Sequence, residues 1–196
     1  MGRLQRADVR ELAHLHREAF PGCFLSRLGE PFLTQFYSGF ISDESAVARD
    51  SSGRPLGAVV GTTEPAGFFG RLVRRKLVGL AFASLRAVVA HPSAAPRLLR
   101  ALAYRGDTME QPGGALLSSI CVDPRRQAGG VGSLLVAAWE ATAPERGARS
   151  AYLTTDAADN DSVNAFYLAR GWLLSSTSNT REGRSMNCYT KNLDGR

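Results

Sequence analysis

The sequence predicts an α/β (α+β) fold in which a mixed sheet is flanked by helices, and three observations predict it. Segments with strand character recur along the chain and alternate with segments whose apolar residues have helical spacing. A Gly-rich turn at 127–132 follows one strand segment and opens into a helix. No internal repeat or low-complexity linker divides the 196 residues, of which 44% are hydrophobic, so one domain over 1–196 is expected.

The first forty residues are expected to be mainly helical. Apolar residues recur near helical spacing over 8–20, and this pattern stops at Pro21. Residues 23–37 are rich in aromatic side chains, and Gly29 and Pro31 break them into two helical pieces. The sequence therefore predicts one amphipathic helix followed by two shorter ones.

Strand segments account for most of the remaining pattern. Residues 44–50 and 55–63 flank a short polar turn, which predicts an antiparallel hairpin. The other strand candidates are 116–122, 150–156, 173–177 and 185–190. The last two are joined by a polar turn, so the helices and strands together predict a mixed sheet with helices beside it.

A long segment, 64–112, separates the hairpin from the strand at 116–122. It carries apolar positions on a basic background, and its helical pieces are expected near 68–82 and 95–104. Such a segment can pack over the domain, form a contact in a homodimer, or lie on a membrane surface. Packing or a dimer contact is favoured, and the segment is too interrupted to span a membrane.

Charge and hydropathy limit the partners. The net charge is +6, but the arginines are spread along the chain and no basic motif interleaved with aromatic residues is present, which argues against nucleic acid. An acidic small ligand and a generic solvated surface explain the charge equally well. The sequence has no apolar run of signal-peptide or membrane-span length, so we expect a cytoplasmic protein without a membrane span.

Histidine and cysteine do not predict a metal site. His14 and His16 lie two positions apart on the first helix and point to different faces, so we expect them in solvent. Cys23, Cys121 and Cys188 are widely spaced and odd in number, which suits a reducing cytoplasm. Cys121 lies in an expected buried strand with no histidine near it in sequence, which favours a core role over a nucleophile.

The Gly-rich turn is the feature that most clearly points to a ligand. Its residues are Gln127, Ala128, Gly129, Gly130, Val131 and Gly132, and Ser133 follows at the helix start. The first amides of a helix lack intrahelical acceptors and lie at the positive end of its dipole, so they bind phosphate well. Gly130 and Gly132 permit positive φ and a close approach of the backbone. We call residues 127–133 the phosphate nest.

Two familiar phosphate motifs do not match the nest. A Walker loop needs a lysine before Ser133, and a dinucleotide fingerprint needs a third glycine where Leu135 stands. A second motif lies downstream, where a short helix from Asn160 ends before Gly171. Asn160, Val163, Asn164 and Tyr167 share one stripe of this helix at i, i+3, i+4 and i+7. This mostly polar stripe is expected to border a polar ligand or solvent.

Together, these two motifs resemble the GCN5-related N-acetyltransferase (GNAT) superfamily. The resemblance covers 116–172 well, and before it only the broad order of elements is similar. It implies a mixed, mostly antiparallel central sheet flanked by helices. It also implies that 64–112 is a helical insert between the third and fourth strands, where the superfamily commonly has a short turn.

The resemblance implies direct acetyl transfer from acetyl-CoA to an amine in a ternary complex, without a covalent enzyme intermediate and without a metal. The nest would hold the pyrophosphate. Backbone groups of Ile120, Cys121 and Val122 would pair with the pantetheine arm, and an amide there could polarise the thioester carbonyl. The arm would lie between the strands at 117–122 and 151–156.

The helix motif supplies the other cofactor-side residues of the resemblance. Tyr167 stands where many members have the tyrosine that protonates the CoA thiolate, and it is the candidate general acid. A tyrosine that only hydrogen-bonds the sulfur, or that packs in the core, is the alternative. Asn160 and Asn164 would bind the pantetheine arm or structure its loop, and helix capping is the alternative for Asn160.

The acceptor side is less well defined. Glu30, Phe32 and Tyr37 are candidate acceptor contacts by resemblance, although core packing is favoured for the two aromatic residues. Many members carry a carboxylate early in the fourth strand, but this chain has Leu and Ser at 116–119. Glu30, Glu110 or Asp156 could substitute, or the acceptor amine could have a low pKa that needs little help.

The missing carboxylate favours the primary amine of a small molecule, an amino sugar among the candidates, over a protein lysine. Two other functions stay open at this point. One is a catalytically silent module that binds or senses acyl-CoA, and the other is an acetyltransferase that acts on a protein amine.

Overall fold

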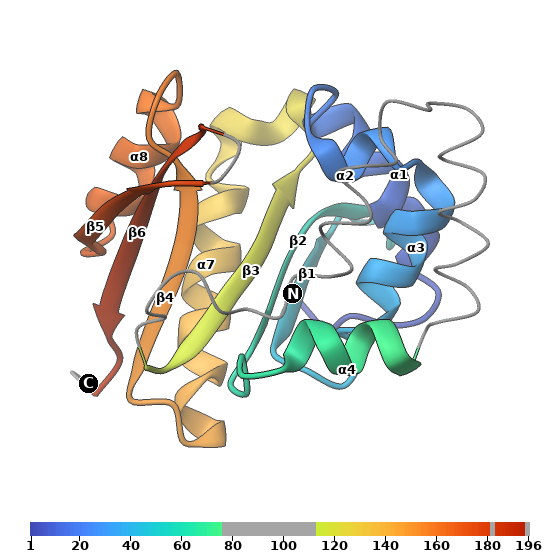
Figure 1. Cartoon of the computed structure of the whole chain (residues 1–196). Helices are drawn as coiled ribbons and strands as arrows, with labels where there is room; N and C mark the ends of the chain where they lie inside the picture. The colour runs from blue at the N-terminus through green and yellow to red at the C-terminus, as the bar shows by residue number, and fades with distance from the viewer. Residues whose placement is uncertain (76–112, 181–182, 195–196) are drawn as a thin grey trace.

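The structure is a computed structural model, and it describes residues 1–75, 113–180 and 183–194 (Figure 1). A six-stranded sheet of order β1-β2-β3-β4-β6-β5 forms its centre. The strands are β1 (Ser45–Arg49), β2 (Pro55–Thr62), β3 (Ala115–Val122), β4 (Ser150–Asp156), β5 (Leu173–Asn179) and β6 (Ser185–Asn192). Of these six described strands, β3 and β4 alone pair in parallel, which confirms the mixed, mostly antiparallel sheet.

The helices flank the sheet on both faces. They are α1 (Val9–Ala19), α2 (Phe24–Arg27), α3 (Glu30–Ser38), α4 (Phe68–Arg75), α7 (Val131–Thr142) and α8 (Asp161–Leu168), with short 3₁₀ turns η2 (Pro124–Gly129) and η3 (Pro144–Arg146). The break between α2 and α3 falls at Gly29, whose φ is 86°, and Pro31 lies in the first turn of α3. There its missing amide and fixed φ are tolerated.

The segment 64–112, expected between the third and fourth strands, follows the second strand, β2, and precedes the third, β3. The strand numbers are one lower than expected because the chain before α1 forms a single bridge, Gly2 to Val47, and not a strand beside β1. The helix expected over 68–82 is present over Phe68–Arg75. The rest of it, the helix expected at 95–104 and Glu110 lie outside the described residues.

Two hydrophobic clusters form the core, one on each face of the sheet. The first packs α1, α3 and α4 against residues such as Val47, Val60 and Cys121. The second packs α7 and α8 against the other face around Trp139, Trp172 and other buried residues. The contact between β2 and α7 is close, because a Cβ at Gly61 would lie 2.6 Å from the Trp139 indole nitrogen.

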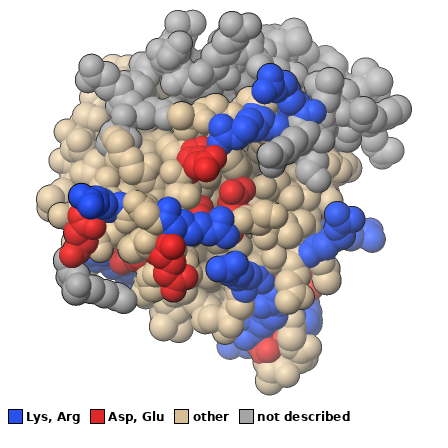
Figure 2. Space-filling view, turned by 90° about the horizontal axis from the view of Figure 1, so that it is seen from below, with Lys and Arg blue, Asp and Glu red and all other residues tan. Residues whose placement is uncertain are grey.

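Charged side chains of both signs lie beside one another on the face shown in Figure 2. Several ion pairs tie distant segments together, among them Arg49 to Asp8 at 2.6 Å and Arg146 to the buried Glu44 at 3.2 Å. Among the helices in the described residues, none is long and apolar enough to cross a membrane. The same residues bring no group of three His, Cys, Asp or Glu side chains together as a metal site.

His16 departs from expectation. His14 is exposed and lies 3.6 Å from Glu18, but His16 is only 3% exposed. The reason is its place on the apolar stripe of α1, because Val9, Leu12 and His16 follow helical spacing and all face the core. Burial lowers the pKa of His16 to about 4.

We therefore expect His16 to make stability depend on pH. Its pKa is about 4 in the fold, against an ordinary value of 6.5, so the unfolded chain binds the proton more readily. The stabilisation is complete above pH 6.5 and is lost as the pH falls towards 4, by about 3 kcal/mol. Urea unfolding at a series of pH values measures this as the difference between the wild type and His16→Leu.

The matched control is His14→Gln, which removes an exposed histidine and should keep the pH dependence of the wild type. The same dependence in His16→Leu as in the wild type would contradict the assignment.

Candidate functional site

The centre of the sheet separates along the line between β3 and β4. The two strands pair only at Ala115 with Ala151 and at Leu116 with Tyr152. Beyond these pairs β3 runs on to Val122 and β4 to Asp156, and the strands diverge (Figure 1). Each stays paired on its other side, β3 with β2 and β4 with β6. Within the described residues, no strand pairs with these facing edges, so they can bond to an extended ligand.

A β-bulge in β3 lies where this separation begins. Val60 pairs with Ser119 and Gly61 with Leu117, so Ser118 is the extra residue. A bulge bends its strand and reverses the alternation of side chains. Accordingly, Leu117 and Val122 both belong to the core cluster under α7, although they are five positions apart. The bulge thus helps to turn β3 away from β4.

The nest follows β3 through the turn η2. The Asp123 carboxylate accepts bonds of 2.9 Å from the backbone amide and the guanidinium of Arg125, which fixes the start of the turn. These bonds hold the pKa of Asp123 below its usual range. Gly130 then takes a φ of 75° and ends the turn, as a residue without Cβ can.

The first turn of α7 leaves three amides for a ligand. The first intrahelical bond runs from the Leu134 amide to the Gly130 carbonyl at 3.1 Å, so the amides of Val131, Gly132 and Ser133 precede it. Positive φ occurs at Gly130 but not at Gly132, contrary to expectation, because Gly132 already lies within α7. Gln127, Gly129 and Gly130 are exposed, and a Cβ on either glycine would meet no atom within 4 Å.

Helix α8 packs against the start of α7. A Cβ at Gly132 would lie 3.5 Å from the Phe166 ring and 3.8 Å from Val122. The Arg170 guanidinium lies over the Phe166 ring at 3.6 Å and donates a hydrogen bond to the Ser133 hydroxyl. Arg170 was not among the site residues predicted from the sequence. Its position as the one cation between Asn160 and Gly171 was the available signal.

The two asparagines tie α8 to the end of β4. Asn160 donates to the Thr155 hydroxyl at 2.8 Å and to the Asp156 carbonyl at 3.1 Å, and its side chain does not cap the helix. Asn164 donates to the same Asp156 carbonyl at 3.2 Å. Its own carbonyl accepts from the Tyr189 hydroxyl at 3.0 Å. These bonds structure the loop that follows β4.

Tyr167 lies between this loop and the core. It is 4% exposed, and its ring contacts Trp172 and Tyr189 at centroid distances of 5.9 and 6.1 Å. Burial raises the pKa of Tyr167 to about 12, although the nearby positive charge of Arg170 acts in the opposite direction. Its hydroxyl makes no hydrogen bond to the described part of the chain, so it can donate one to a ligand.

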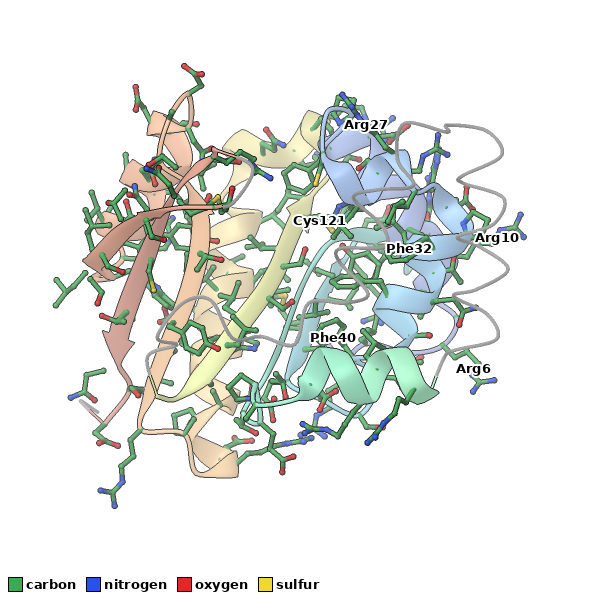
Figure 3. The ribbon with its side chains drawn as sticks, in the orientation of Figure 1. Arg6, Arg10, Arg27, Phe32, Phe40 and Cys121 are labelled. Carbon is green, nitrogen blue, oxygen red and sulfur yellow. The ribbon has the colours of Figure 1, made fainter. Side chains whose placement is uncertain are left out.

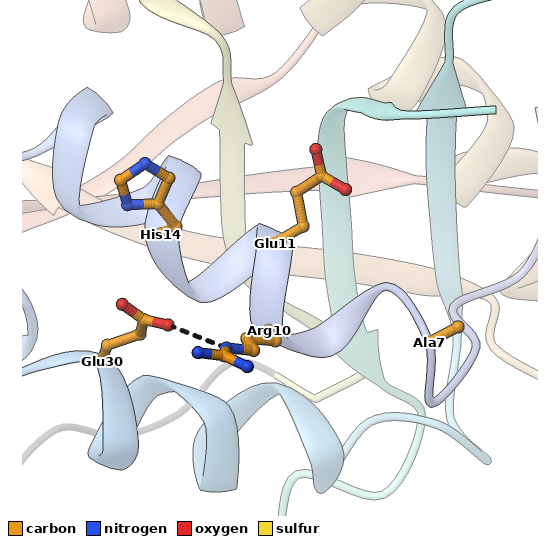
Figure 4. Close-up of a pocket in the computed structure, with 5 residues that line it drawn as sticks. All are labelled: Ala7, Arg10, Glu11, His14 and Glu30. Carbon is orange, nitrogen blue, oxygen red and sulfur yellow. Dashed lines mark ion pairs between the residues drawn. The ribbon is translucent and has the colours of Figure 1, made fainter. Parts of the chain in front are cut away.

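The residues expected on the acceptor side do not form one site. Glu30 lies 3.6 Å from Arg10 in a surface pocket of about 390 Å³ between α1 and α3 (Figure 4). Phe32 is half-buried on α3 (Figure 3). Tyr37, in contrast, is 1% exposed and bonds to His16 Nδ1 at 2.8 Å and to Cys121 Sγ at 3.3 Å.

Cys121 and Asp156 are both held by neighbours. Burial raises the pKa of the Cys121 thiol, and its side chain lies in the core, while its backbone stays on β3 next to Ile120 and Val122. The Asp156 carboxylate binds Arg184 through contacts of 2.6, 2.7 and 3.1 Å. Both carboxylate oxygens of Asp156 therefore accept from the Arg184 guanidinium.

A family model for the acetyltransferase (GNAT) family matches residues 9–172. The chain belongs to this family. The enzyme is therefore a GNAT acetyltransferase, and the family implies acetyl-CoA as acyl donor. A comparison with curated proteins finds no match to this acetyltransferase.

Solved structures similar to this acetyltransferase agree on the fold. Aminoglycoside 6′-acetyltransferase type Ii matches with a TM-score of 0.64 and 16% identity over 100% of this chain and 97% of its own. Ard1 from Thermoplasma volcanium matches with 0.62 and 13% over 97% and 95%. Naa20 from Chaetomium thermophilum, in complex with a bisubstrate analogue, matches with 0.58 and 18% over 98% and 87%.

The role of Asn164 in holding the loop leads to a stability prediction. Asn164→Ala removes a donor to the Asp156 carbonyl and leaves the buried Tyr189 hydroxyl without its acceptor. We expect the free energy of unfolding to fall by about 2–3 kcal/mol. Asn160→Ala is the comparison, and it should cost about 1 kcal/mol because it orphans no buried hydroxyl. Chemical denaturation measures both, and equal costs would contradict the assignment.

Proposed function

We propose that this acetyltransferase transfers the acetyl group of acetyl-CoA to the primary amine of a small molecule, by direct attack in a ternary complex. The observation that carries the proposal is the separation of β3 from β4 directly before the nest at the start of α7. An unpaired strand edge suits the amides of a pantetheine arm, and helix-start amides suit a pyrophosphate. β3 leads directly into the nest along the chain, just as the pantetheine arm is joined directly to the pyrophosphate in acetyl-CoA.

The residues fit acetyl-CoA in two further respects. Backbone groups of Ile120, Cys121 and Val122 lie on the part of β3 that β4 no longer pairs with, so they can bond to the arm as a further strand. At the nest, Gly129 and Gly130 face open space, which lets phosphate oxygens approach the backbone. An amide on this part of β3 would polarise the thioester carbonyl.

Tyr167 is the residue we propose to act on the leaving group. The amine forms the new N–C bond while the C–S bond breaks. The attacking nitrogen gives up one proton to water, and the thiolate takes one proton from water, so the step needs no net proton. With a pKa of about 12 the tyrosine is protonated at any physiological pH. Because the pKa of a thiol is about 8.5, full transfer from Tyr167 is uphill, and hydrogen-bond donation to the developing thiolate is its main contribution.

The described residues favour an acceptor amine that needs little help in losing its proton. Residues 116–119 carry no carboxylate, Asp156 is bound by Arg184, and Glu30 is paired with Arg10. An amine of low pKa, such as that of an amino sugar, is already partly neutral at pH 7, whereas a lysine with a pKa of about 10.4 is not. This is the reason for preferring a small-molecule amine to a protein lysine.

We also propose that residues 1–196 act as one domain in the cytoplasm. The three cysteines are free, and Cys23 is exposed, which suits a reducing compartment.

Calorimetric titration with acetyl-CoA, followed by an amine panel, tests the proposed function. We expect one saturable site with a Kd in the micromolar range, about −8 kcal/mol, and turnover with amino sugars. Binding without turnover of any amine would favour a silent acyl-CoA-binding module. Efficient acetylation of peptide lysines, with none of small amines, would favour a protein acceptor. No binding would overturn the proposal.

Tyr167→Phe should separate chemistry from binding. It removes the hydroxyl that donates to the developing thiolate, so we expect kcat to fall about 10- to 100-fold, because a hydrogen bond to a charged group contributes about 1.5–3 kcal/mol. The Kd for acetyl-CoA should stay within twofold. Tyr189→Phe is the matched control, because it removes a buried hydroxyl that bonds to Asn164, and it should retain most of the turnover. Equal kcat values for Tyr167→Phe and the wild type would exclude this role.

A further inference from the structure

A pocket of about 390 Å³ lies beside the nest, along the exposed side of α7. Ser133 at the start of α7 and Glu140 farther along the helix line it, and Arg170 and Lys191 close it from the end of α8 and from β6. This pocket adjoins the amides assigned to the pyrophosphate, because Ser133 belongs to both. None of the roles given above to the nest or to Tyr167 uses it.

Arg170 is held in one orientation at this pocket. Its guanidinium lies over the Phe166 ring at 3.6 Å, and Nη1 donates to the Phe166 carbonyl at 2.7 Å. Nη2 donates to the Ser133 hydroxyl. A guanidinium fixed in this way loses little entropy on binding, and its remaining N–H groups are free to bind an anion.

The charges around the pocket favour an anion. Of the described residues that line the pocket, Glu140 is the one that is acidic. Lys191 Nζ lies 2.7 Å from one oxygen of its carboxylate, and the Trp172 indole donates to the other oxygen at 2.8 Å. Lys191 therefore compensates the charge of Glu140. Within the described chain, no carboxylate forms an ion pair with Arg170, so its charge is not neutralised by the protein.

We infer that Arg170 and this pocket form a second phosphate-binding subsite, distinct from the amides of the nest, which takes a phosphate of CoA. The inference rests on the proposed function. An Arg fork binds phosphate through two parallel charge-assisted bonds, which helix amides alone do not supply. CoA offers two sources of this chemistry, the pyrophosphate itself and the phosphomonoester on its ribose.

Calorimetric titrations of the full chain with CoA and with 3′-dephospho-CoA test the subsite. Arg170→Gln should raise the Kd for CoA at least tenfold, and Arg170→Lys should give an intermediate value because it keeps a point charge without the fork. The control is Arg149→Gln, which removes one exposed positive charge from the residue just before β4 and should change the Kd less than twofold. Thermal unfolding of each variant shows whether it is folded.

The second ligand identifies the phosphate. If the subsite takes the ribose phosphate, 3′-dephospho-CoA should bind the wild type and Arg170→Gln equally. If it takes the pyrophosphate, the tenfold loss should persist with 3′-dephospho-CoA. Ser133→Ala keeps the guanidinium but removes its hydroxyl partner, so it should weaken CoA binding less than Arg170→Gln does. Ser133→Ala therefore tests the subsite even if Arg170→Gln is unfolded. If Ser133→Ala raised the Kd for CoA more than Arg170→Lys does, the assignment to Arg170 would be contradicted.

Two failures are distinguishable. If folded Arg170→Gln binds CoA as tightly as Arg149→Gln does, the subsite is wrong while the proposed function stands. If the wild type binds no CoA, the proposed function fails and the subsite fails with it.

Discussion

The parallel pairing of β3 and β4 ends after Leu116 and Tyr152, and the proposed chemistry of the site depends on this interruption. Backbone groups left unpaired inside a sheet are unfavourable, so the rest of the fold has to hold the strands apart. Three features do so in the structure. Each strand is paired along most or all of its other side, the bulge at Ser118 bends β3, and Asn160 and Asn164 both hold the Asp156 carbonyl at the end of β4.

The contact between α7 and α8 joins the two halves of the site. Phe166 packs close to Gly132, and Arg170 bonds to Ser133, so the nest is held against the helix that carries Tyr167. A Cβ at position 132 would lie 3.5 Å from the Phe166 ring, an ordinary van der Waals distance, so neither φ nor close packing requires a glycine there. The proposed phosphate end and the proposed thioester end of the site are thereby fixed to each other through α8.

Local signals predicted much of this arrangement, and tertiary contacts decided the rest. The hairpin, the break at Gly29, the helix start after Gly130 and the stripe with Tyr167 follow from short-range pattern. The bulge at Ser118 depends on the register between β3 and β2, which no spacing within β3 encodes. The spacing of His16 with Val9 and Leu12 predicts its burial, whereas the polarity of histidine predicts exposure to solvent. The spacing was the better guide for this residue.

The buried polar contacts behind β3 bear on the choice of acceptor. His16, Tyr37 and Cys121 are linked through the Tyr37 hydroxyl, and burial lowers the pKa of His16 while it raises those of Tyr37 and Cys121. All three are therefore neutral near pH 7. Among the described residues, these three side chains offer no fixed charge to an ammonium ion, which supports the proposed preference for amines of low pKa.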